Sequence, residues 1–254
     1  MLHAARWHSI PDLDVNKSSS DGIWLSDAWV AHENEYRLRG GPLFLSPLVV
    51  FGLHVSWHRS WALPVDTVPG AIAVVASLIG LGVRMWGTAV LSGATMVAMS
   101  ARTDRLITGG IFGLVRNPMY LGDLLIFPSY TMLLSPWLTP PFALYHIIRV
   151  LRLCAFEERR MLARWGDEYE AYCRSVPRLM PRSARLRPAP AKWGDGLRSS
   201  SAWIGFVCGY MASVITHDLW SLIPCVTIGF LYFWYHFSRK TSSSSATAGS
   251  APVS

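Results

Sequence analysis

Long apolar stretches alternate along the chain with short polar segments that contain prolines, glycines or charged residues. Six apolar runs share this arrangement and lie at residues 42–57, 70–90, 119–134, 142–156, 202–215 and 219–237. Most of them approach the ~20 apolar residues that an α-helix needs to cross the hydrocarbon core of a bilayer. The pattern predicts an all-α fold, a polytopic integral membrane helical bundle with about six transmembrane helices.

The same pattern separates a membrane domain from two polar ends. Residues 1–40 form a polar N-terminal tail without an apolar run, so no cleavable signal peptide is expected, and the tail is either a short amphipathic helix on the membrane surface or a loosely ordered segment. The membrane domain covers residues 41–238 and closes with an extra helical hairpin at 202–237. The serine- and alanine-rich tail, residues 239–254, is expected to be disordered.

Composition supports a membrane protein and locates one of its sides. The chain is 51% hydrophobic and only 15% charged, which is too apolar for an ordinary soluble domain. Although the net charge is +7, 12 of the 23 Lys and Arg lie between Arg149 and Arg198, beside apolar runs, as the positive-inside bias produces. We therefore expect no nucleic-acid partner. Both termini, residues 91–118 and residues 157–201 are expected on the cytoplasmic side.

Two features inside the apolar runs bear on function. The four cysteines show no metal-type spacing, so we expect reduced core residues and no metal site. Arg84 interrupts the run at 70–90, and a charge at that depth costs ~2.5–3.5 kcal/mol unless it is paired, so its side chain must point inward or to the interface. Gly80 and Gly82 precede Arg84 on the same helix, and for these small residues close helix packing is favoured over contact with a cofactor.

A polar, glycine-bearing loop meets an apolar run within residues 103–122. Gly109 and Gly110 let backbone approach a ligand closely, and the N–H groups that open the next helix are unpaired, which suits a carboxylate or an adenosine. The alternative is a capped helix start, with Asn117 as the N-cap and Pro118 at the first helical position. Taken alone, this segment favours the capped helix start.

Glu157 and Glu158 add a second candidate feature near the cytoplasmic edge. Neighbouring helical residues point about 100° apart, so we expect one carboxylate to face the bundle and the other the surface. Glu157 either forms an ion pair with Arg160 one turn later or binds a cationic ligand.

Several short motifs of this chain occur in order and at preserved spacing in one known family. They are Leu106-Ile107-Thr108-Gly109-Gly110, Arg116-Asn117-Pro118-Met119-Tyr120-Leu121-Gly122, Glu157-Glu158, Trp165-Gly166-Asp167-Glu168-Tyr169, Tyr172 and Val176-Pro177-Arg178-Leu179-Met180-Pro181. They resemble the isoprenylcysteine carboxyl methyltransferase family, whose general plan related phospholipid N-methyltransferases share, and the match covers roughly residues 70–182. The resemblance implies an integral membrane enzyme that uses S-adenosyl-L-methionine, bound at the cytoplasmic edge.

The resemblance also implies roles for individual residues. The implied cofactor-binding residues are Asp104, Arg105, Leu106, Ile107, Phe112, Asn117, Pro118, Met119, Tyr120, Gly122 and Glu157. The implied catalytic residues are Arg116, Glu158 and Arg178. A carboxylate near the cofactor is chemically reasonable, because S-adenosylmethionine carries a sulfonium and an amino group that are both cationic. Methyl transfer then needs mainly alignment and exclusion of water, with no obligate base when the acceptor is a carboxylate.

Three departures from the family pattern leave the methyl acceptor open. Asn117 stands where the family usually has His, and Phe112 where it often has Tyr. Leu153 occupies the position at which eukaryotic members that methylate prenylcysteine have Arg, so recognition of an acceptor carboxylate is altered or passes to an arginine nearby. The candidates for that role are Arg149, Arg152 and Arg178.

The leading functional hypothesis is a membrane methyltransferase that transfers a methyl group to a lipophilic or small carboxylate or thiol acceptor. The alternative is N-methylation of a phospholipid of the phosphatidylethanolamine type. A second alternative is a non-catalytic membrane scaffold or transport component on the same bundle, and a membrane reductase is less favoured. The expected partners are the lipid bilayer and the methyl acceptor; the sequence predicts no oligomeric state.

Overall fold

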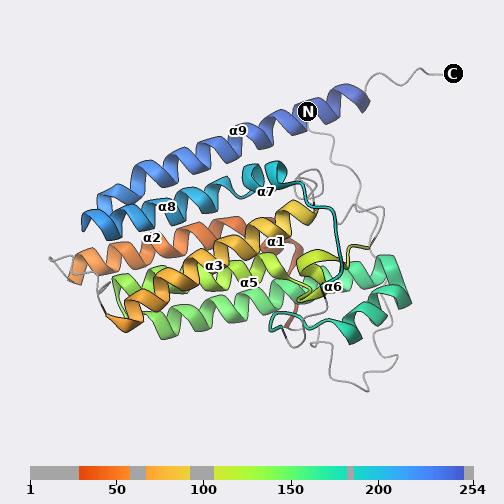
Figure 1. Ribbon diagram of the computed structural model, residues 1–254, viewed down its shortest axis with the longest axis horizontal. Coiled ribbons are helices and arrows are strands. Elements are labelled where there is room, and N and C mark those ends of the chain that lie inside the picture. Colours follow the sequence, from red (N-terminus) through yellow and green to blue (C-terminus); the bar gives the residue numbers. More distant parts are fainter. Residues whose placement is uncertain (1–28, 58–66, 92–105, 182–185, 249–254) are drawn as a thin grey trace.

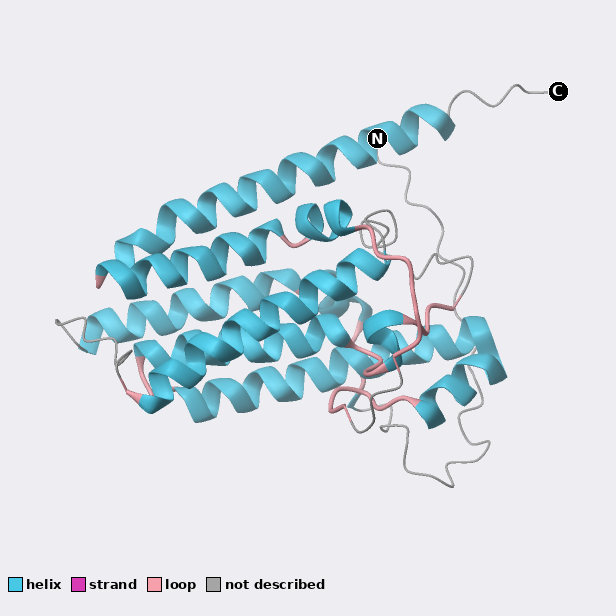
Figure 2. Ribbon diagram, in the orientation of Figure 1, coloured by secondary structure: helices cyan, strands magenta, loops and turns pink. Residues whose placement is uncertain are grey.

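The computed structural model describes residues 29–57, 67–91, 106–181 and 186–248, and these ranges contain helices and connecting segments but no strand (Figures 1 and 2). The predicted all-α fold is therefore confirmed. The long helices lie side by side: α2 (Gly40–Trp57), α3 (Val68–Leu91), α5 (Pro118–Leu134), α6 (Thr139–Ser175), α8 (Ser201–Thr216) and α9 (Leu222–Ala248). The short helices α1 (Glu33–Arg37), η2 (Gly110–Gly113) and α7 (Trp193–Ser199) gather toward one end of the bundle.

Apolar length distinguishes α3 from the other helices. Among the described residues, Val68–Leu91 is the one helix both long and apolar enough to cross a membrane by itself, and shorter apolar helical stretches occupy Gly40–His54, Ser201–Thr216 and Leu222–His236. Large apolar side chains on α2 and α3 are exposed, including Leu48, Val49, Ile72 and Ile79. The six crossings and the cytoplasmic side of the bundle stay predictions.

The core is centred on α5, which packs against α2, α3 and α6. Ile126, Phe127, Tyr130 and Leu133 of α5 are almost completely buried. Phe206 of α8 packs on this surface, with ring centroids 5.1 Å from Phe127 and 5.0 Å from Tyr130. The extra C-terminal hairpin is therefore part of the core rather than an appendage.

A buried ion pair joins α3, α5 and α8. Arg84 donates to the Asp123 carboxylate at 2.8 Å and to the carbonyl of Met119 at 3.3 Å. Trp203 Nε1 donates to the same carboxylate oxygen at 2.8 Å, and the Arg84 guanidinium lies 3.3 Å from the centre of its ring. The expectation that Arg84 points inward is confirmed, but its partner Asp123 was not among the residues singled out from the sequence.

Glycines allow two helix pairs to approach closely. A Cβ at Gly80 of α3 would lie 2.8 Å from the carbonyl oxygen of Gly122 on α5, and a Cβ at Gly205 of α8 would lie 2.9 Å from the Cα of Gly229 on α9. The close-packing prediction is confirmed for Gly80. It is wrong for Gly82, where a Cβ would meet nothing within 4 Å, because this glycine faces outward.

The last residues of the N-terminal tail pack on α6 instead of lying free. The Tyr36 ring lies 4.8 Å from that of Phe156, and Arg152 donates to the Glu35 carboxylate at 2.9 Å. This hydrogen bond from Arg152 holds the pKa of Glu35 below its ordinary value. For residues 29–39, the loosely ordered tail is wrong, because a short helix, α1, forms there and is fixed to α6 by aromatic contacts and an ion pair. Its placement on the membrane surface stays a prediction, and residues 1–28 lie outside the described ranges.

Helix α6 is the longest of the described helices and continues beyond the predicted apolar run at 142–156. Gly166, with a φ of 49°, bends it near its C-terminal end, and the chain then returns through a non-helical segment toward the start of α5. Of the cysteines, Cys154 and Cys173 are buried as expected, whereas the core assignment is wrong for Cys208, whose side chain is exposed.

The contact between α3 and α5 gives a testable prediction. We expect Gly80→Ala to lower the stability of the protein by about 1–3 kcal/mol, because the added methyl group would displace the backbone of α5. Thermal unfolding in detergent would measure this loss.

Gly82→Ala is the matched control on the same helix. Its methyl group enters open space, and alanine favours a helix by about 1 kcal/mol over glycine, so its unfolding temperature should stay equal or rise. Equal losses in the two variants would contradict the assigned packing.

Candidate cofactor site

The candidate site forms where the loop before α5 meets α6 and the segment that follows it. Arg116 N donates to the carbonyl of Pro177 at 2.9 Å, and Asn117 N donates to that of Arg178 at 3.2 Å. The Tyr172 hydroxyl donates to the carbonyl of Phe112 at 2.7 Å. These hydrogen bonds pair backbone N–H and C=O groups of the loop that no helix pairs. The end of α6 and the segment after it therefore fix the position at which α5 begins.

The two loop glycines make room for another part of the chain. Gly110 has a φ of 59°, and its N–H donates to the carbonyl of Arg187 at 2.8 Å. A Cβ at Gly109 would lie 3.0 Å from that of Ala189. Close approach of backbone was expected here, and residues 187–189 account for it without a ligand.

Glu158 lies at the centre of the site and is almost completely buried, with a relative exposure of 1%. Arg178 donates to it through Nε, at 3.1 Å to each carboxylate oxygen, and through Nη2 at 2.8 Å. The Asn117 amide donates at 3.0 Å, and Arg116 Nε lies 3.5 Å from Oε1. One carboxylate therefore faces two guanidinium groups, and its charge is fully used within the protein.

Glu157 has different partners, although it is the next residue. It is partly buried and accepts a hydrogen bond from the Tyr120 hydroxyl at 3.0 Å. The Tyr36 hydroxyl also bonds to it; burial and this carboxylate raise the pKa of Tyr36. Arg39 lies 4.2 Å from the centre of the Tyr36 ring. The expected division between a buried and a less buried glutamate is confirmed, and Glu157 is the one that phenol groups surround.

Arg116 is a buried cation with unused hydrogen-bonding capacity. Its side chain is 6% exposed, and neither Nε nor Nη1 forms a hydrogen bond with any described residue. Nearby Cys173 has its pKa raised by burial, an effect that the positive charge of Arg116 opposes. Buried guanidinium donors without a partner are costly, which makes this side chain a candidate for binding an anionic group of a ligand.

The other residues implied by the resemblance fall into three groups. Leu106 packs with the cluster around Tyr169 and Tyr172, while Ile107 and Phe112 pack with Val90 of α3. Three residues of α5 face α3. Gly122 packs against Gly80, and the carbonyl of Met119 accepts a hydrogen bond from Arg84. Pro118 lies next to Gly87. Asp104 and Arg105 lie outside the described residues.

Asn117 precedes the first residue of α5, Pro118, as the capped-helix alternative predicted. Its side chain, however, makes no capping hydrogen bond and donates instead to Glu158. The capping role is therefore wrong, because the buried carboxylate competes for the amide. This contact brings the loop and the glutamate pair together.

Sequence reasoning did not place Tyr36 or Arg39 in the site, because both belong to a segment that was expected on the membrane surface or loosely ordered. Their only signal was an aromatic residue among charged ones, just before the first apolar run. The arginines proposed for an acceptor carboxylate are all engaged: Arg149 donates to the carbonyl of Arg39, Arg152 pairs with Glu35, and Arg178 pairs with Glu158. Among the described residues, no cluster of three His, Cys, Asp or Glu side chains is placed to hold a metal ion.

Replacing each of the two neighbouring glutamates by glutamine should lower the stability of the protein by very different amounts. Glu158→Gln leaves two arginines without their counter-charge and should cost about 3–5 kcal/mol of stability. Glu157→Gln keeps an acceptor for the tyrosine hydroxyls and should cost less than about 1 kcal/mol. Thermal unfolding of both variants in detergent measures the difference, and similar losses would contradict the assigned charge balance.

Comparisons with known proteins match part of this chain. The phospholipid methyltransferase family model matches residues 68–168, which include α5 and the glutamate pair. Methanethiol S-methyltransferase 2 of Bradyrhizobium diazoefficiens is 37% identical over 79 residues, covering 28% of this chain and 27% of that protein. No solved structure matches the chain.

Two further relatives have other names. The cobalt-zinc-cadmium resistance protein CzcN of Cupriavidus metallidurans is 28% identical over 145 residues, covering 57% of this chain and 62% of that protein. The Delta(14)-sterol reductase of Mus musculus is 32% identical over 85 residues, covering 32% and 20%. The chain spans less than two thirds of the length of each of these three relatives. The family match over residues 68–168 and the methyltransferase relatives support a membrane methyltransferase similar to isoprenylcysteine carboxyl methyltransferase.

Proposed function

We propose that this protein transfers a methyl group from S-adenosylmethionine to a lipophilic or small acceptor, at the cytoplasmic edge of a bundle of about six membrane crossings. The observation that carries the proposal is the contrast within the site. Glu157 accepts hydrogen bonds from neutral phenols, with the charge of Arg39 nearby, and Arg116 has guanidinium donors without hydrogen-bond partners. An anionic group and a cationic group are thus both placed to take a ligand that carries both charges.

The residues present fit the charged groups of S-adenosylmethionine. Glu157 would hold the cationic amino or sulfonium group, and Arg116 the carboxylate, each through a charge-assisted interaction in a partly desolvated site. Glu158 and Arg178 would act by keeping Arg116 and Asn117 in place, because their own charges are already paired. When bound, this cofactor supplies an activated methyl group, and the protein contributes alignment and exclusion of water.

The ionisation of the site supports an acceptor that needs no deprotonation. The raised pKa values of Tyr36 and Cys173 keep both groups protonated at neutral pH, so neither is suited to take a proton from an acceptor. A carboxylate acceptor needs no such base. A small thiol is the other acceptor we consider, since one relative is named for the S-methylation of methanethiol.

Phospholipid N-methylation is the second candidate, and the description of the matching family model favours it. Transfer of a radiolabelled methyl group to membrane lipids, prenylcysteine analogues and small thiols would test the proposal and choose among acceptors. Labelled phosphatidylethanolamine derivatives would support the second candidate. Absence of both transfer and cofactor binding would instead favour a non-catalytic membrane component.

Glu157→Gln should weaken the binding of S-adenosylmethionine by about 10- to 100-fold, the equivalent of a charged hydrogen bond of ~1.5–3 kcal/mol. Calorimetric titration of the purified protein in detergent measures the affinity. Glu170→Gln is the control, because Glu170 pairs with Arg174 on the exposed side of the same helix. This variant should bind S-adenosylmethionine as the parent protein does. Unchanged affinity in Glu157→Gln would remove this residue from the site.

Arg116→Gln should weaken the binding of S-adenosylmethionine but should have little effect on the binding of an analogue that lacks the carboxylate. The parent protein should bind the analogue about 10-fold or more weakly than S-adenosylmethionine, because the buried guanidinium loses its partner. Calorimetric titration of the parent protein and the variant with both ligands gives the four affinities that this comparison needs. If the variant still distinguishes the two ligands as the parent does, Arg116 does not hold the carboxylate.

A further inference from the structure

The guanidinium of Arg39 is held less firmly than those of the other arginines near the site. Its Nη1 donates one hydrogen bond, to the carbonyl of Tyr36 at 3.2 Å, and it forms no ion pair with a carboxylate of the described residues. Arg84 and Arg178, in contrast, each donate to a buried carboxylate at 2.8 Å. The Arg39 guanidinium can therefore move away without breaking an ion pair.

Aromatic side chains lie beside the position of this guanidinium. Its central carbon is 4.2 Å from the centre of the Tyr36 ring, and that ring packs on Phe156 with centroids 4.8 Å apart. The hydroxyls of Tyr36 and Tyr120 both bond to the Glu157 carboxylate. Aromatic rings attract cations through their negative faces, so rings and a carboxylate act together here.

The electrostatics of this position favour a positive charge. Burial disfavours the charged form of Arg39, yet its pKa is raised, because the phenols of Tyr36 and Tyr120 and the Glu157 carboxylate together favour the cation. A cation is thus more stable here than in water. The same groups would favour the positive charge of a ligand that replaces the guanidinium.

A cation without N–H groups suits these surroundings best. A guanidinium or an amine needs acceptors for its N–H donors, and Arg39 finds one such acceptor among the described residues. An onium cation, meaning a sulfonium or a quaternary ammonium, has no N–H donor and is bound by negative charge and aromatic faces alone. Those are the two features that Glu157 and the neighbouring rings supply.

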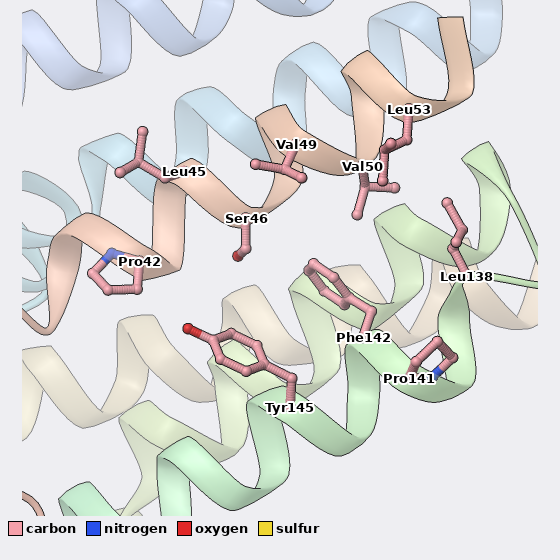
Figure 3. Close-up of a pocket in the computed structure, with 10 residues that line it drawn as sticks. All are labelled: Pro42, Leu45, Ser46, Val49, Val50, Leu53, Leu138, Pro141, Phe142 and Tyr145. Atoms are coloured by element: carbon pink, nitrogen blue, oxygen red, sulfur yellow. The ribbon is translucent and has the colours of Figure 1, made fainter. Parts of the chain in front are cut away.

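The apolar groove on the outside of the bundle is no alternative site for such a cation. It has a volume of about 400 Å³ and lies between α2 and the first half of α6 (Figure 3). The residues that line it lie between Pro42 and Leu53 and between Leu138 and Tyr145, and none of them is charged. A cation in this groove would lose its hydration without gaining a counter-charge.

We propose that the position of the Arg39 guanidinium is a binding site for an onium cation, and that Arg39 is an internal cation which such a ligand displaces. The inference rests on the proposed function in one respect, namely that the displacing group is the sulfonium of S-adenosylmethionine and not its amino group. Arg39 then determines specificity, because a neutral analogue has no charge with which to displace it. Only the side chain moves, since the carbonyl of Arg39 stays bonded to Arg149.

Tetramethylammonium and trimethylsulfonium are small probes of this site, and tert-butanol is a neutral molecule of similar shape. Saturation-transfer NMR of the full chain in a neutral detergent measures their binding. The parent protein should bind both cations but not tert-butanol, and Arg39→Gln should bind the cations about tenfold more tightly. Arg174→Gln is the matched control, because it removes an exposed charge that pairs with Glu170 near the end of α6, and it should bind as the parent protein does.

Equal affinities of the parent protein and Arg39→Gln for the two cations would overturn the proposal. An equal gain in Arg174→Gln would also overturn it, because the gain would then follow from the lower net charge alone. Arg39→Lys keeps the charge and should bind the probes no more tightly than the parent protein.

A second measurement uses the parent protein alone, so that a misfolded variant cannot decide the outcome. Phenylglyoxal modifies guanidinium groups, and mass spectrometry locates the modified residues. Tetramethylammonium should increase the modification of Arg39 by about twofold or more, because the displaced side chain enters water, and should leave that of Arg174 unchanged. Unchanged or lower modification of Arg39 would overturn the displacement.

S-adenosylmethionine and S-adenosylhomocysteine separate this inference from the proposed function, because the second ligand has a neutral thioether in place of the sulfonium. Arg39→Gln should strengthen the binding of the first about tenfold and leave that of the second unchanged. An equal gain for both ligands would overturn the assignment to the sulfonium. If the parent protein binds the small cations but neither nucleoside, the proposed function fails and the onium site stands.

Discussion

The buried carboxylate of Glu158 is the constraint on which the site depends. A charge removed from water must find partners, and its partners come from the loop before α5 and from the segment after α6. Arg178 approaches it from one side, while Arg116 and Asn117 approach from the other. Through these contacts, one ionised group sets the start of α5 relative to α6, which are joined directly only by a short turn at the opposite end.

A second buried charge stabilises the same helix from its other side. Arg84 reaches Asp123 and the carbonyl of Met119, and Trp203 brings α8 into this network. The first turns of α5 are therefore held between two ionic clusters, one on α3 and one on α6. Such a helix start is well suited to position ligand-binding groups, because the rotamers around it are restrained by hydrogen bonds.

These two ionic clusters determine which of the remaining charged groups near α6 are available to bind a ligand. Glu158 has no spare charge, so a cationic ligand is better served by Glu157, which points about 100° away on the same helix. Arg116 keeps unused donors, because one carboxylate cannot satisfy two complete guanidinium groups. Arg39 links the start of α2 to α6, with its carbonyl bonded to Arg149 and its guanidinium on Tyr36.

The sequence by itself determined the all-helical architecture, the hairpin after residue 201 and the division of the glutamate pair into a more and a less buried side chain, because apolar periods and residue spacing are local properties. It also required the Arg84 side chain to be paired or to reach the interface. Only the tertiary structure decided that its partner is Asp123, that Asn117 binds Glu158 instead of capping its helix, and that Tyr36 packs on α6. The physical reason is that a charge in a sequence demands compensation without specifying its source. The source depends on which helix faces meet, and residues 41 positions apart, such as Asn117 and Glu158, become neighbours only after the helices pack.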